Sequence, residues 1–589
     1  RRPQPAAVHY SNFSDPNYRF EFWVHVNTSK MTLFLKHSPK LPYLSALAKM
    51  CYSTKSGWMK PEGYKTGILV QNPLTGNSEE LVLKYPTHAT WYICGPTVYD
   101  SAHIGHGCSY VRFDIIRRIL ENVGKIKVFQ VMGITDIDDK IIAKCFQKNM
   151  SLQDLTRKYE DEFFYDMSKL NVIRPSLVAR VTDHLPQIEA FISGIKSRGL
   201  AYSVDGSLYF DVKNYKNYGK FKQEDEWNKD WNKKSNKDFA LWKKAKPGEP
   251  CWKMKLGDEG RPGWHIECSS IASYYLGDEV DIHSGGIDLR FPHHENEEAQ
   301  SCAYFEKKQW VNYWLHSGHL ILHGAKMSKS LENTITIRDI LKKYSPIDFR
   351  IFCLLSHYSS DVKFSEGSMD TAVGIHRKLA NFLCSVKAIK NGTEIPSEAI
   401  LQKFTEVKLK VKQYLLQNFN TPLATMEVLA LVDLVNKIIH ESHKQEQHKY
   451  EFKGCCGIVA IEIVASYVRD YFQGLGIEFE PNQSVTEGEE RLQEICDQVI
   501  KEALQLRNSV RSVCLTSEKH KVILDDPSVK KELLSACDKF RNNLNKAGIT
   551  IKVKLGIDIT LNNKLFLGSF KVFSLVGKQV TVLPCIHPF

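Results

Sequence analysis

The stretch TWYICGPTVYDSAHIGHGCSYVRFDIIRRILENVGKIKVFQVMGITD, residues 90–136, decides the fold of this chain. Residues 90–94 are apolar and suit a strand, Gly95 and Pro96 interrupt them, and residues 110–122 place apolar side chains at a helical spacing. Residues 127–132 predict a second strand. A strand, a helix and another strand imply a parallel sheet, which binds its ligands at the carboxyl ends of the strands. We therefore predict an α/β fold.

The tetrapeptide HIGH, residues 103–106, falls where the predicted helix begins. A helix N-terminus binds phosphate through free N–H groups and the helix dipole, and two imidazoles there can add hydrogen bonds to a triphosphate. The same tetrapeptide can also arise by chance or form a metal-binding pair. Neither GxxxxGK[ST] nor GxGxxG is present, so the common phosphate-loop and dinucleotide fingerprints are absent.

A second stretch, DIHSGGIDLRFPHHENEEAQ at residues 281–300, concentrates metal-ligating side chains. His293 and Glu297 are four residues apart, and so are His294 and Glu298. Each pair shares one face of a helix and can hold one ion. We expect one pair to face a site and the other to face a neighbouring helix. The alternative is a solvated, acidic helix start.

Two further segments carry reactive side chains. Residues 326–330, KMSKS, follow Gly324, and a glycine-flanked loop with two lysines and two serines suits a mobile clamp on a transferring phosphate. An ordinary surface loop is the alternative. Cys268 lies in RPGWHIECS, residues 261–269, without a CxxC partner. We therefore expect its partners to be distant in sequence.

Bulk composition sets the broad class of the protein. A chain of 589 residues is long enough for several domains, and its net charge of +12 favours a polyanionic partner. Fifteen cysteines, an odd number without small-domain spacing, indicate a reducing compartment. The longest apolar run, residues 455–468, is too short to span a bilayer and contains Glu462. We expect a soluble protein that is not in the membrane.

Together these segments resemble the cysteinyl-tRNA synthetases, a family of class I aminoacyl-tRNA synthetases. The resemblance covers roughly residues 88–480 in the expected order. It rests on CGPTVYD (94–100), HIGH, DFALWK (238–243), RPGWHIECS, FPHHENE (291–297) and KMSKS. HIGH and KMSKS indicate the class, and CGPTVYD, RPGWHIECS and FPHHENE indicate the cysteine enzyme. The chain has HSGG at residues 283–286 where the family usually has HGGG. Because His283 is kept, we expect little change.

The resemblance implies a set of site residues. The zinc ligands would be Cys94, Cys268, His293 and Glu297, which selects His293 over His294. The ATP-binding residues would be His103, Ile104, Gly105, His106, Lys326, Met327, Ser328, Lys329 and Ser330. The catalytic residues among them would be His103, His106, Lys326 and Lys329, with Mg²⁺ accompanying ATP. The cysteine-binding residues would be Gly95, Thr135, Trp264 and His293. As alternatives, Thr135 caps the helix over residues 136–144 and Trp264 belongs to the core.

The implied reaction is the ATP-dependent attachment of L-cysteine to tRNA(Cys) through a cysteinyl-adenylate. Shape alone separates cysteine from serine by only about 1–3 kcal/mol, whereas zinc binds a thiolate strongly. Four protein ligands usually signal a closed structural zinc site, so selection by zinc requires weak binding by Glu297 or a fifth ligand. Two alternatives are a cysteine-activating ligase that acts on a small-molecule amine and an inactive tRNA-binding paralogue.

The resemblance also implies the domain order. A Rossmann-like parallel-sheet catalytic domain would span residues 61–365, with an insertion at about 150–260, in which residues 151–200 are helical and residues 214–238 form a loop. An α-helical bundle would follow at 366–485, and helices at 489–505 and 528–546 would form an anticodon-side region at 486–550. Residues 551–589 form an atypical tail without the family's pattern.

Residues 1–60 are predicted to be an N-terminal extension. From Met31 to Pro61 there are lysines at 36, 40, 49, 55 and 60 and no acidic residue, a composition typical of an organelle transit peptide. Residues 1–30 contain Asp15 and Glu21 and fit such a peptide poorly. We predict a mitochondrial matrix protein. The alternatives are a disordered basic tail and a cytoplasmic location, and no oligomeric state is predicted.

Overall fold

The computed structural model describes residues 57–221, 233–255, 259–322, 334–387, 395–445, 456–479 and 527–546, together with short segments and single positions outside these ranges. The chain forms two compact units, Arg1–Lys55 and Ser56–Phe589. The described residues of the first unit are an antiparallel pair, β1 (Val24–Asn27) and β2 (Lys30–Leu33). The second unit contains the predicted catalytic and helical regions.

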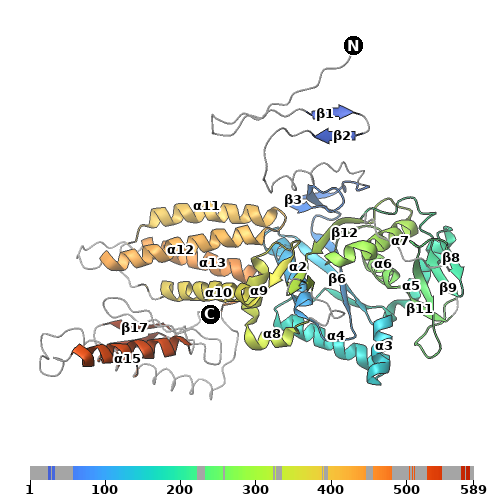
Figure 1. Cartoon of the computed structure of the whole chain (residues 1–589). Coiled ribbons are helices and arrows are strands. Elements are labelled where there is room, and N and C mark those ends of the chain that lie inside the picture. Colours follow the sequence, from blue (N-terminus) through green and yellow to red (C-terminus); the bar gives the residue numbers. More distant parts are fainter. Residues whose placement is uncertain are drawn as a thin grey trace, which may run out of the picture. The chain divides into compact units, whose positions relative to one another are not determined.

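The centre of the second unit is a sheet of five parallel strands, which confirms the predicted α/β class (Figure 1). Its spatial order is β13 (Val311–Ser317), β12 (Val280–Gly286), β5 (His88–Thr97), β6 (Lys127–Thr135) and β7 (Leu177–Arg180). The chain first builds outward from β5 to β7 and then crosses to β12 on the other side of β5. The strand order therefore reverses between β5 and β12, where open α/β sheets bind their ligands.

Helices connect these strands. They are α2 (Ile104–Asn122), α3 (Asp139–Lys148), α4 (Leu152–Lys169), α5 (Leu185–Ser197), α6 (Trp264–Leu276) and α7 (Glu295–Phe305). Asp138 and Ser151 accept backbone hydrogen bonds at the starts of α3 and α4, so the sequence marks both beginnings. The prediction of helix throughout residues 151–200 is wrong at β7. That strand has only four residues, and its parallel pairing with β6 determines its conformation.

A separate antiparallel sheet lies within the predicted insertion. Its order is β11 (Gly260–Pro262), β10 (Phe239–Lys244), β9 (Ser207–Phe210) and β8 (Ala201–Val204). The strand β7 also falls in the range assigned to the insertion but belongs to the central sheet. Residues 222–232 of the predicted loop lie outside the described residues.

Smaller elements complete the second unit. They are β3 (Tyr64–Gln71), β4 (Ser78–Leu83), the turns η2 (Thr182–His184), η3 (Ile287–Leu289) and η4 (Arg290–His294), β14 (Leu320–Leu322), β15 (Ala325–Lys326), β16 (Val362–Phe364), α8 (Ile337–Lys343) and α9 (Pro346–Leu354). Ser345 and Asp348 form a capping box at the start of α9, with Pro346 in its first turn.

The C-terminal half is a bundle of the helices α10 (Glu366–Lys387), α11 (Ser397–Leu416), α12 (Thr421–Gln445) and α13 (Cys456–Gly474), which lie side by side in Figure 1. The predicted apolar stripes form its core, since Leu379, Phe382, Val407 and Val411 are all buried. Among the described residues, no helix combines the length and apolar character needed to cross a bilayer.

The C-terminal region is described in part. The helix α15 (Pro527–Lys546) confirms the prediction for residues 528–546, whereas most of residues 489–505 lie outside the described residues. In the tail, where no element was predicted, β17 (Val572–Val576) pairs with β18 (Gln579–Leu583).

A buried ion pair joins α2 to the bundle. Arg350 on α9 donates to the Asp114 carboxylate on α2 at 2.5 Å and to the carbonyl of Leu475, just after α13, at 2.7 Å. The same guanidinium donates to the carbonyls of Leu170 and Asn171 at the end of α4. Both side chains of the ion pair are about 1 % exposed. Breaking such a pair leaves a buried charge, which is more costly than losing a surface pair.

We expect Arg350→Met to lower the free energy of unfolding by about 3 kcal/mol, because Asp114 and three carbonyls lose a shared buried donor. The midpoint of urea unfolding, followed by tryptophan fluorescence, measures the change. Lys342→Met is the matched control, since Lys342 forms an exposed pair with Asp339 within α8. An equal shift in both variants would contradict the role assigned to Arg350.

Candidate active site

The HIGH tetrapeptide begins α2, as the sequence predicts, but the helix end is closed by its own histidines. The Nδ1 atom of His103 accepts hydrogen bonds from the N–H groups of Gly105 and His106, and the N–H of His103 donates to Nδ1 of His106 at 3.3 Å. The two rings stack with their centroids 3.8 Å apart. The expectation of free N–H groups is therefore wrong at Gly105 and His106. A phosphate at this end would meet the imidazoles first.

A cleft of about 700 Å³ opens at the carboxyl ends of β5, β6 and β12. It is lined by the predicted residues Cys94, Gly95, His103, Gly105, His106, Thr135, Trp264, Cys268 and His293. Ile104 does not line it, because its side chain is fully buried in the core beneath α2. Met327 to Ser330 lie outside the described residues, and of Lys326 only the backbone, in β15, is described.

Four predicted ligands come together at the floor of this cleft. Cys94 lies near the carboxyl end of β5, Cys268 lies on α6, and His293 and Glu297 lie at the junction of η4 and α7. Their ligand atoms all lie within 4.8 Å of one another, and all four residues are buried. The Cys94 and Cys268 sulfurs are 4.0 Å apart, and Nε2 of His293 is 3.0 Å from Oε1 of Glu297.

These distances fit a metal ion with soft ligands. A tetrahedral zinc with Zn–S bonds of about 2.3 Å would hold two sulfurs about 3.8 Å apart. The observed sulfur–sulfur distance of 4.0 Å is close to that value. Two sulfurs, an imidazole and a carboxylate are also a donor set that zinc accepts. The residues present therefore fit the ion that the sequence implies.

A second possible ligand group overlaps the first. It consists of Cys94, His283, His294 and Glu297. His283 and His294 are fully buried and do not line the cleft, whereas Cys94, Cys268 and His293 do. His294 also faces Nε2 of His316, 2.9 Å from its Nδ1. The first group therefore presents three residues to the cleft, whereas the second presents Cys94 alone.

The other carboxylate of the acidic stretch points elsewhere. Glu298 pairs with Lys220 of the insertion at 2.6 Å and accepts hydrogen bonds from the backbone of Trp310 and Val311. The prediction that the two His–Glu pairs face different surroundings is confirmed for the carboxylates. The neighbours of Glu298 are Lys220 and the start of β13, however, and not a helix.

Burial and close contact shift the ionisation of the four ligands. A hydrogen bond from Cys94 lowers the pKa of the Cys268 thiol to about 6, while burial holds the pKa of Cys94 well above its usual value. Burial opposes charge on Glu297, but His283 and His293 hold the pKa of its carboxyl at about 2. Burial also opposes charge on His293, yet Glu297 raises its pKa to about 10. An arriving cation would therefore meet two anions, Cys268 and Glu297, and would displace two protons, one from the Cys94 thiol and one from His293.

A second layer of imidazoles orients these ligands. Nε2 of His283 lies 2.8 Å from Oε2 of Glu297, which leaves Oε1 on the side of the cysteines. Nδ1 of His265 lies 2.9 Å from Nδ1 of His293. Burial and the charge on His293 lower the pKa of His265, so His265 is the acceptor in that bond and Nε2 of His293 faces the cluster. Such partners fix the tautomer and orientation of metal ligands.

The predicted cysteine pocket lies beside the cluster. A Cβ atom on Gly95 would lie 2.2 Å from the carbonyl oxygen of Gly133, so only glycine fits there. Thr135 donates to Glu267 at 3.0 Å, and α3 is capped by Asp138, so the capping alternative for Thr135 is wrong. Trp264 is 40 % exposed and its ring lies 4.3 Å from that of His293, so the core alternative is wrong as well.

Several residues around the cleft are not among those predicted from the sequence. Lys140 and Lys144 line it from α3, and Tyr110 lines it while donating to the Cys94 carbonyl at 3.0 Å. The two lysines could have been found from the sequence, because they are four residues apart on a helix that follows the end of a strand and so share one face of that helix. Tyr110 carried no signal, because an aromatic residue at a helical spacing is usually core.

Comparisons with known proteins support the class of this site. A family model described as the catalytic domain of class I (C) tRNA synthetases matches residues 81–374. Two structures of Mycobacterium tuberculosis methionyl-tRNA synthetase bound to methionyl-adenylate have the same fold, with TM-scores of 0.52 and 0.53 and 15 % and 14 % identity. Each covers 67 % of this chain, and the match covers 92 % of the solved chain. The fold is that of a class I aminoacyl-tRNA synthetase.

Relatives in sequence narrow this class. A probable mitochondrial cysteine–tRNA ligase of Xenopus tropicalis is 42 % identical over 529 residues, which cover 85 % of this chain and 91 % of that protein. The cytoplasmic cysteine–tRNA ligase of Dictyostelium discoideum is 37 % identical over 84 % of this chain and 79 % of that protein. The enzyme of Methanococcus vannielii is 46 % identical over 55 % of this chain and 70 % of its own length. The chain belongs to the cysteine–tRNA ligase family.

The closed helix end leads to a test of His103. We expect His103→Ala to destabilise the protein by about 1 kcal/mol, because two N–H groups of α2 lose their acceptor. His103→Asn keeps a favoured cap and should retain nearly all of the stability, although both variants lose the imidazole. Thermal unfolding of the two variants beside the unchanged chain makes the comparison. If Ala and Asn were equally harmful, capping would not be the structural role of this side chain.

Proposed function

We propose that this protein attaches L-cysteine to tRNA(Cys) at the expense of ATP, through a cysteinyl-adenylate. The observation that carries the proposal is the group Cys94, Cys268, His293 and Glu297, three members of which open into the same cleft as the HIGH histidines. With a sulfur-rich ligand set beside the HIGH histidines, selection and activation of the amino acid would take place in one cavity. Family membership supports the same reaction.

The ligand group would hold one zinc ion. When bound, this ion supplies a soft Lewis acid that favours a thiolate over the hydroxyl of serine. His283 holds one oxygen of Glu297, so only Oε1 is left for the metal and the carboxylate acts as a single-point ligand. This arrangement supports the weak fourth ligand that selection by zinc requires. Gly95, Thr135 and Trp264 would surround the remainder of the amino acid.

Other residues of the chain would serve the nucleotide. The negative charge that develops on the α-phosphate needs donors already in place, and His103 and His106 stand at the cleft wall. Lys326 and Lys329 would add two cations from the KMSKS segment, with Met327, Ser328 and Ser330 beside them. Mg²⁺ would accompany ATP and neutralise the departing pyrophosphate. The bundle and the net charge of +12 suit the polyanionic tRNA.

The metal assignment and the reaction are tested together with His293→Ala and His294→Ala. The two variants remove the same atoms from adjacent buried residues, so their cavity costs are matched. We expect His293→Ala to lose zinc, with affinity falling more than about 100-fold, and His294→Ala to lose about tenfold or less. Zinc per chain is measured by elemental analysis after dialysis, with no need for activity.

The same proteins are then assayed for pyrophosphate exchange with cysteine and with serine, and for charging of tRNA(Cys). We expect the preference for cysteine to fall in His293→Ala to the 10–200-fold that shape can supply, at about 1–3 kcal/mol. The unchanged chain should charge tRNA. Exchange without charging would contradict the transfer step, and zinc loss in His294→Ala alone would reassign the ligands to the second group.

We also propose that the protein acts in the mitochondrial matrix. The basic composition of residues 31–61 and the mitochondrial relative of Xenopus tropicalis support this location. We expect a fluorescent protein preceded by residues 31–61 to overlap a mitochondrial dye. Changing Lys36, Lys40 and Lys49 to Glu is the control that should abolish import. A cytosolic signal from the unchanged segment would contradict the proposal.

A further inference from the structure

The motif RPGWHIECS contains one acidic side chain that neither the metal ligands nor the nucleotide end of the cleft explains. Glu267 lies on α6 directly before the ligand Cys268 and is 2 % exposed. Its carboxylate accepts a hydrogen bond from the Thr135 hydroxyl at 3.0 Å. Among the described residues, no lysine, arginine or histidine forms an ion pair with it. A buried carboxylate without a cationic partner is unfavourable, so a cation from outside the chain would stabilise it.

Further acidic groups surround Glu267. The carboxyl groups of Asp136 and Asp138 lie close enough to act on it electrostatically. Asp136 accepts hydrogen bonds from the backbone and the hydroxyl of Thr182, and Asp138 caps α3. Within the described part of the chain, neither forms an ion pair. The region where β6 ends and α3 begins therefore favours an ammonium group over a carboxylate or a phosphate.

The direction of the hydrogen bond from Thr135 points to the same kind of ligand. The hydroxyl of Thr135 has one proton, and this proton is donated to Glu267. Thr135 also lines the reaction cleft. On the cleft side, its oxygen can therefore accept a hydrogen bond but cannot donate one. An ammonium group has three donors and no acceptor and complements this oxygen, whereas a carboxylate does not.

The other walls of the cleft suit the other two groups of a cysteine molecule. Under the proposed function, on which this inference rests, the thiol lies at the metal ligands and the carboxylate faces the α-phosphate near the HIGH histidines. The α-ammonium then remains for the side of the cleft that Thr135 lines. Glu267 stands behind that side, since it does not line the cleft itself.

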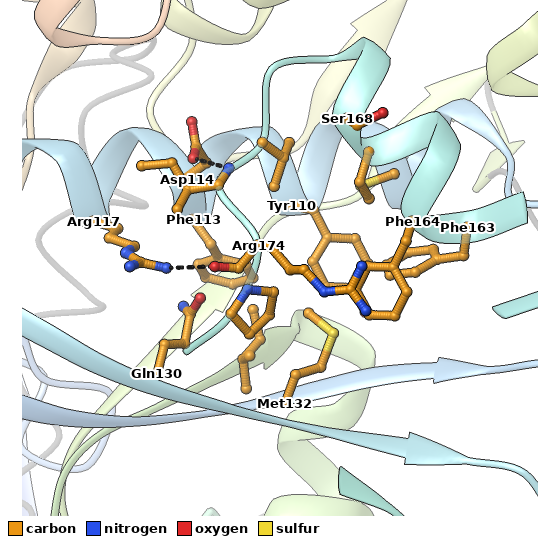
Figure 2. Close-up of a pocket in the computed structure, with 15 residues that line it drawn as sticks. Tyr110, Phe113, Asp114, Arg117, Gln130, Met132, Phe163, Phe164, Ser168 and Arg174 are labelled. Carbon is orange, nitrogen blue, oxygen red and sulfur yellow. Dashed lines mark hydrogen bonds between the residues drawn. The ribbon is translucent and has the colours of Figure 1, made fainter. Parts of the chain in front are cut away.

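The other space beside β6 does not suit an ammonium group. It is a cavity of about 100 Å³ between α2, β6 and α4, and neither Thr135 nor Glu267 lines it (Figure 2). Figure 2 shows Arg117 and Arg174 among its lining residues. The one carboxylate of its wall, Asp114, is already paired with two arginines. A cation would meet no unpaired anion among the residues that line this cavity.

We propose that Glu267 is a positioning residue for the α-ammonium group of cysteine. It holds the Thr135 hydroxyl with its proton turned away from the cleft, so that the oxygen accepts a hydrogen bond from the ammonium group. The buried carboxylate also balances the positive charge of that group across Thr135. Glu267 thereby separates an α-amino acid from a thiol acid that lacks the amino group.

A double-mutant cycle with Glu267→Leu and Thr135→Val tests the proposal on the zinc-loaded full chain. Titration calorimetry measures the affinities for L-cysteine and for 3-mercaptopropionate, which keeps the thiol and the carboxylate but lacks the α-ammonium group. We expect Glu267→Leu to weaken cysteine binding about tenfold, the equivalent of about 1.4 kcal/mol, and to leave the affinity for 3-mercaptopropionate unchanged. Because Glu267 acts through Thr135, the double variant should lose no more cysteine affinity than Thr135→Val alone.

Two further variants complete the test. Glu160→Leu removes another buried glutamate, on α4 and outside the cleft, and should change neither affinity. Glu267→Gln keeps the size of the side chain and should also weaken cysteine binding alone, which keeps the test decisive if Glu267→Leu does not fold. Equal losses for both ligands, or additive losses in the cycle, would overturn the role of Glu267. If neither ligand bound to the unchanged chain, the proposed function itself would fail, and this inference with it.

Discussion

The site depends on one buried carboxylate. Glu297 has no exposed surface, and its two oxygens are held by His283 from β12 and His293 from the turn before α7. A charge removed from water must be paired, or the group becomes neutral or the fold becomes less stable. The two imidazoles supply that pairing and keep the carboxylate ionised. The position of Glu297 therefore fixes the end of β12 and the start of α7 relative to each other.

Strand register places the sulfurs against this carboxylate. His283 on β12 stands opposite Tyr92 on β5, and Cys94 follows two residues later on the same strand. Glycine makes this packing possible, since a Cβ atom on Gly95 would strike the backbone of Gly133, which pairs with Cys94 in β6. A shift of one residue between β5 and β12 would turn Cys94 to the opposite face of the sheet. Parallel pairing therefore sets the position of Cys94 relative to His283.

How much of the structure could be predicted from the sequence depends on how far apart in the chain the interacting residues lie. The strands β5 and β6, the helix α2 and the bundle were predictable, because their apolar periodicity is local. The short strand β7 was not, since its conformation depends on pairing with β6. The ligands Cys94, Cys268, His293 and Glu297 followed from a resemblance. Their spacing alone did not distinguish His293 from His294. In the structure each histidine belongs to a possible ligand group, and the two groups share Cys94 and Glu297.

The cap of α2 shows a second reason why parts of the structure could not be predicted from the sequence. Histidine is not among the side chains that usually cap helices, so no sequence rule predicts that His103 bonds to its own helix. The structure places it as the cap and in the wall of the cleft at once. His103 thereby performs the structural task that aspartate and serine perform at the starts of α3 and α4.

The helix α2 connects these features along one axis. Its first residue follows the His103 cap, Tyr110 in its second turn bonds to the Cys94 carbonyl, and Asp114 in its third turn meets Arg350, which bonds to the end of the bundle at Leu475. A continuous helix of 19 residues is stiff, so these three contacts cannot shift independently. The end of β5 at Cys94, the HIGH end of the cleft and the end of the bundle are therefore held by contacts to one element. The helical half thus contributes to the geometry of the cleft without lining it.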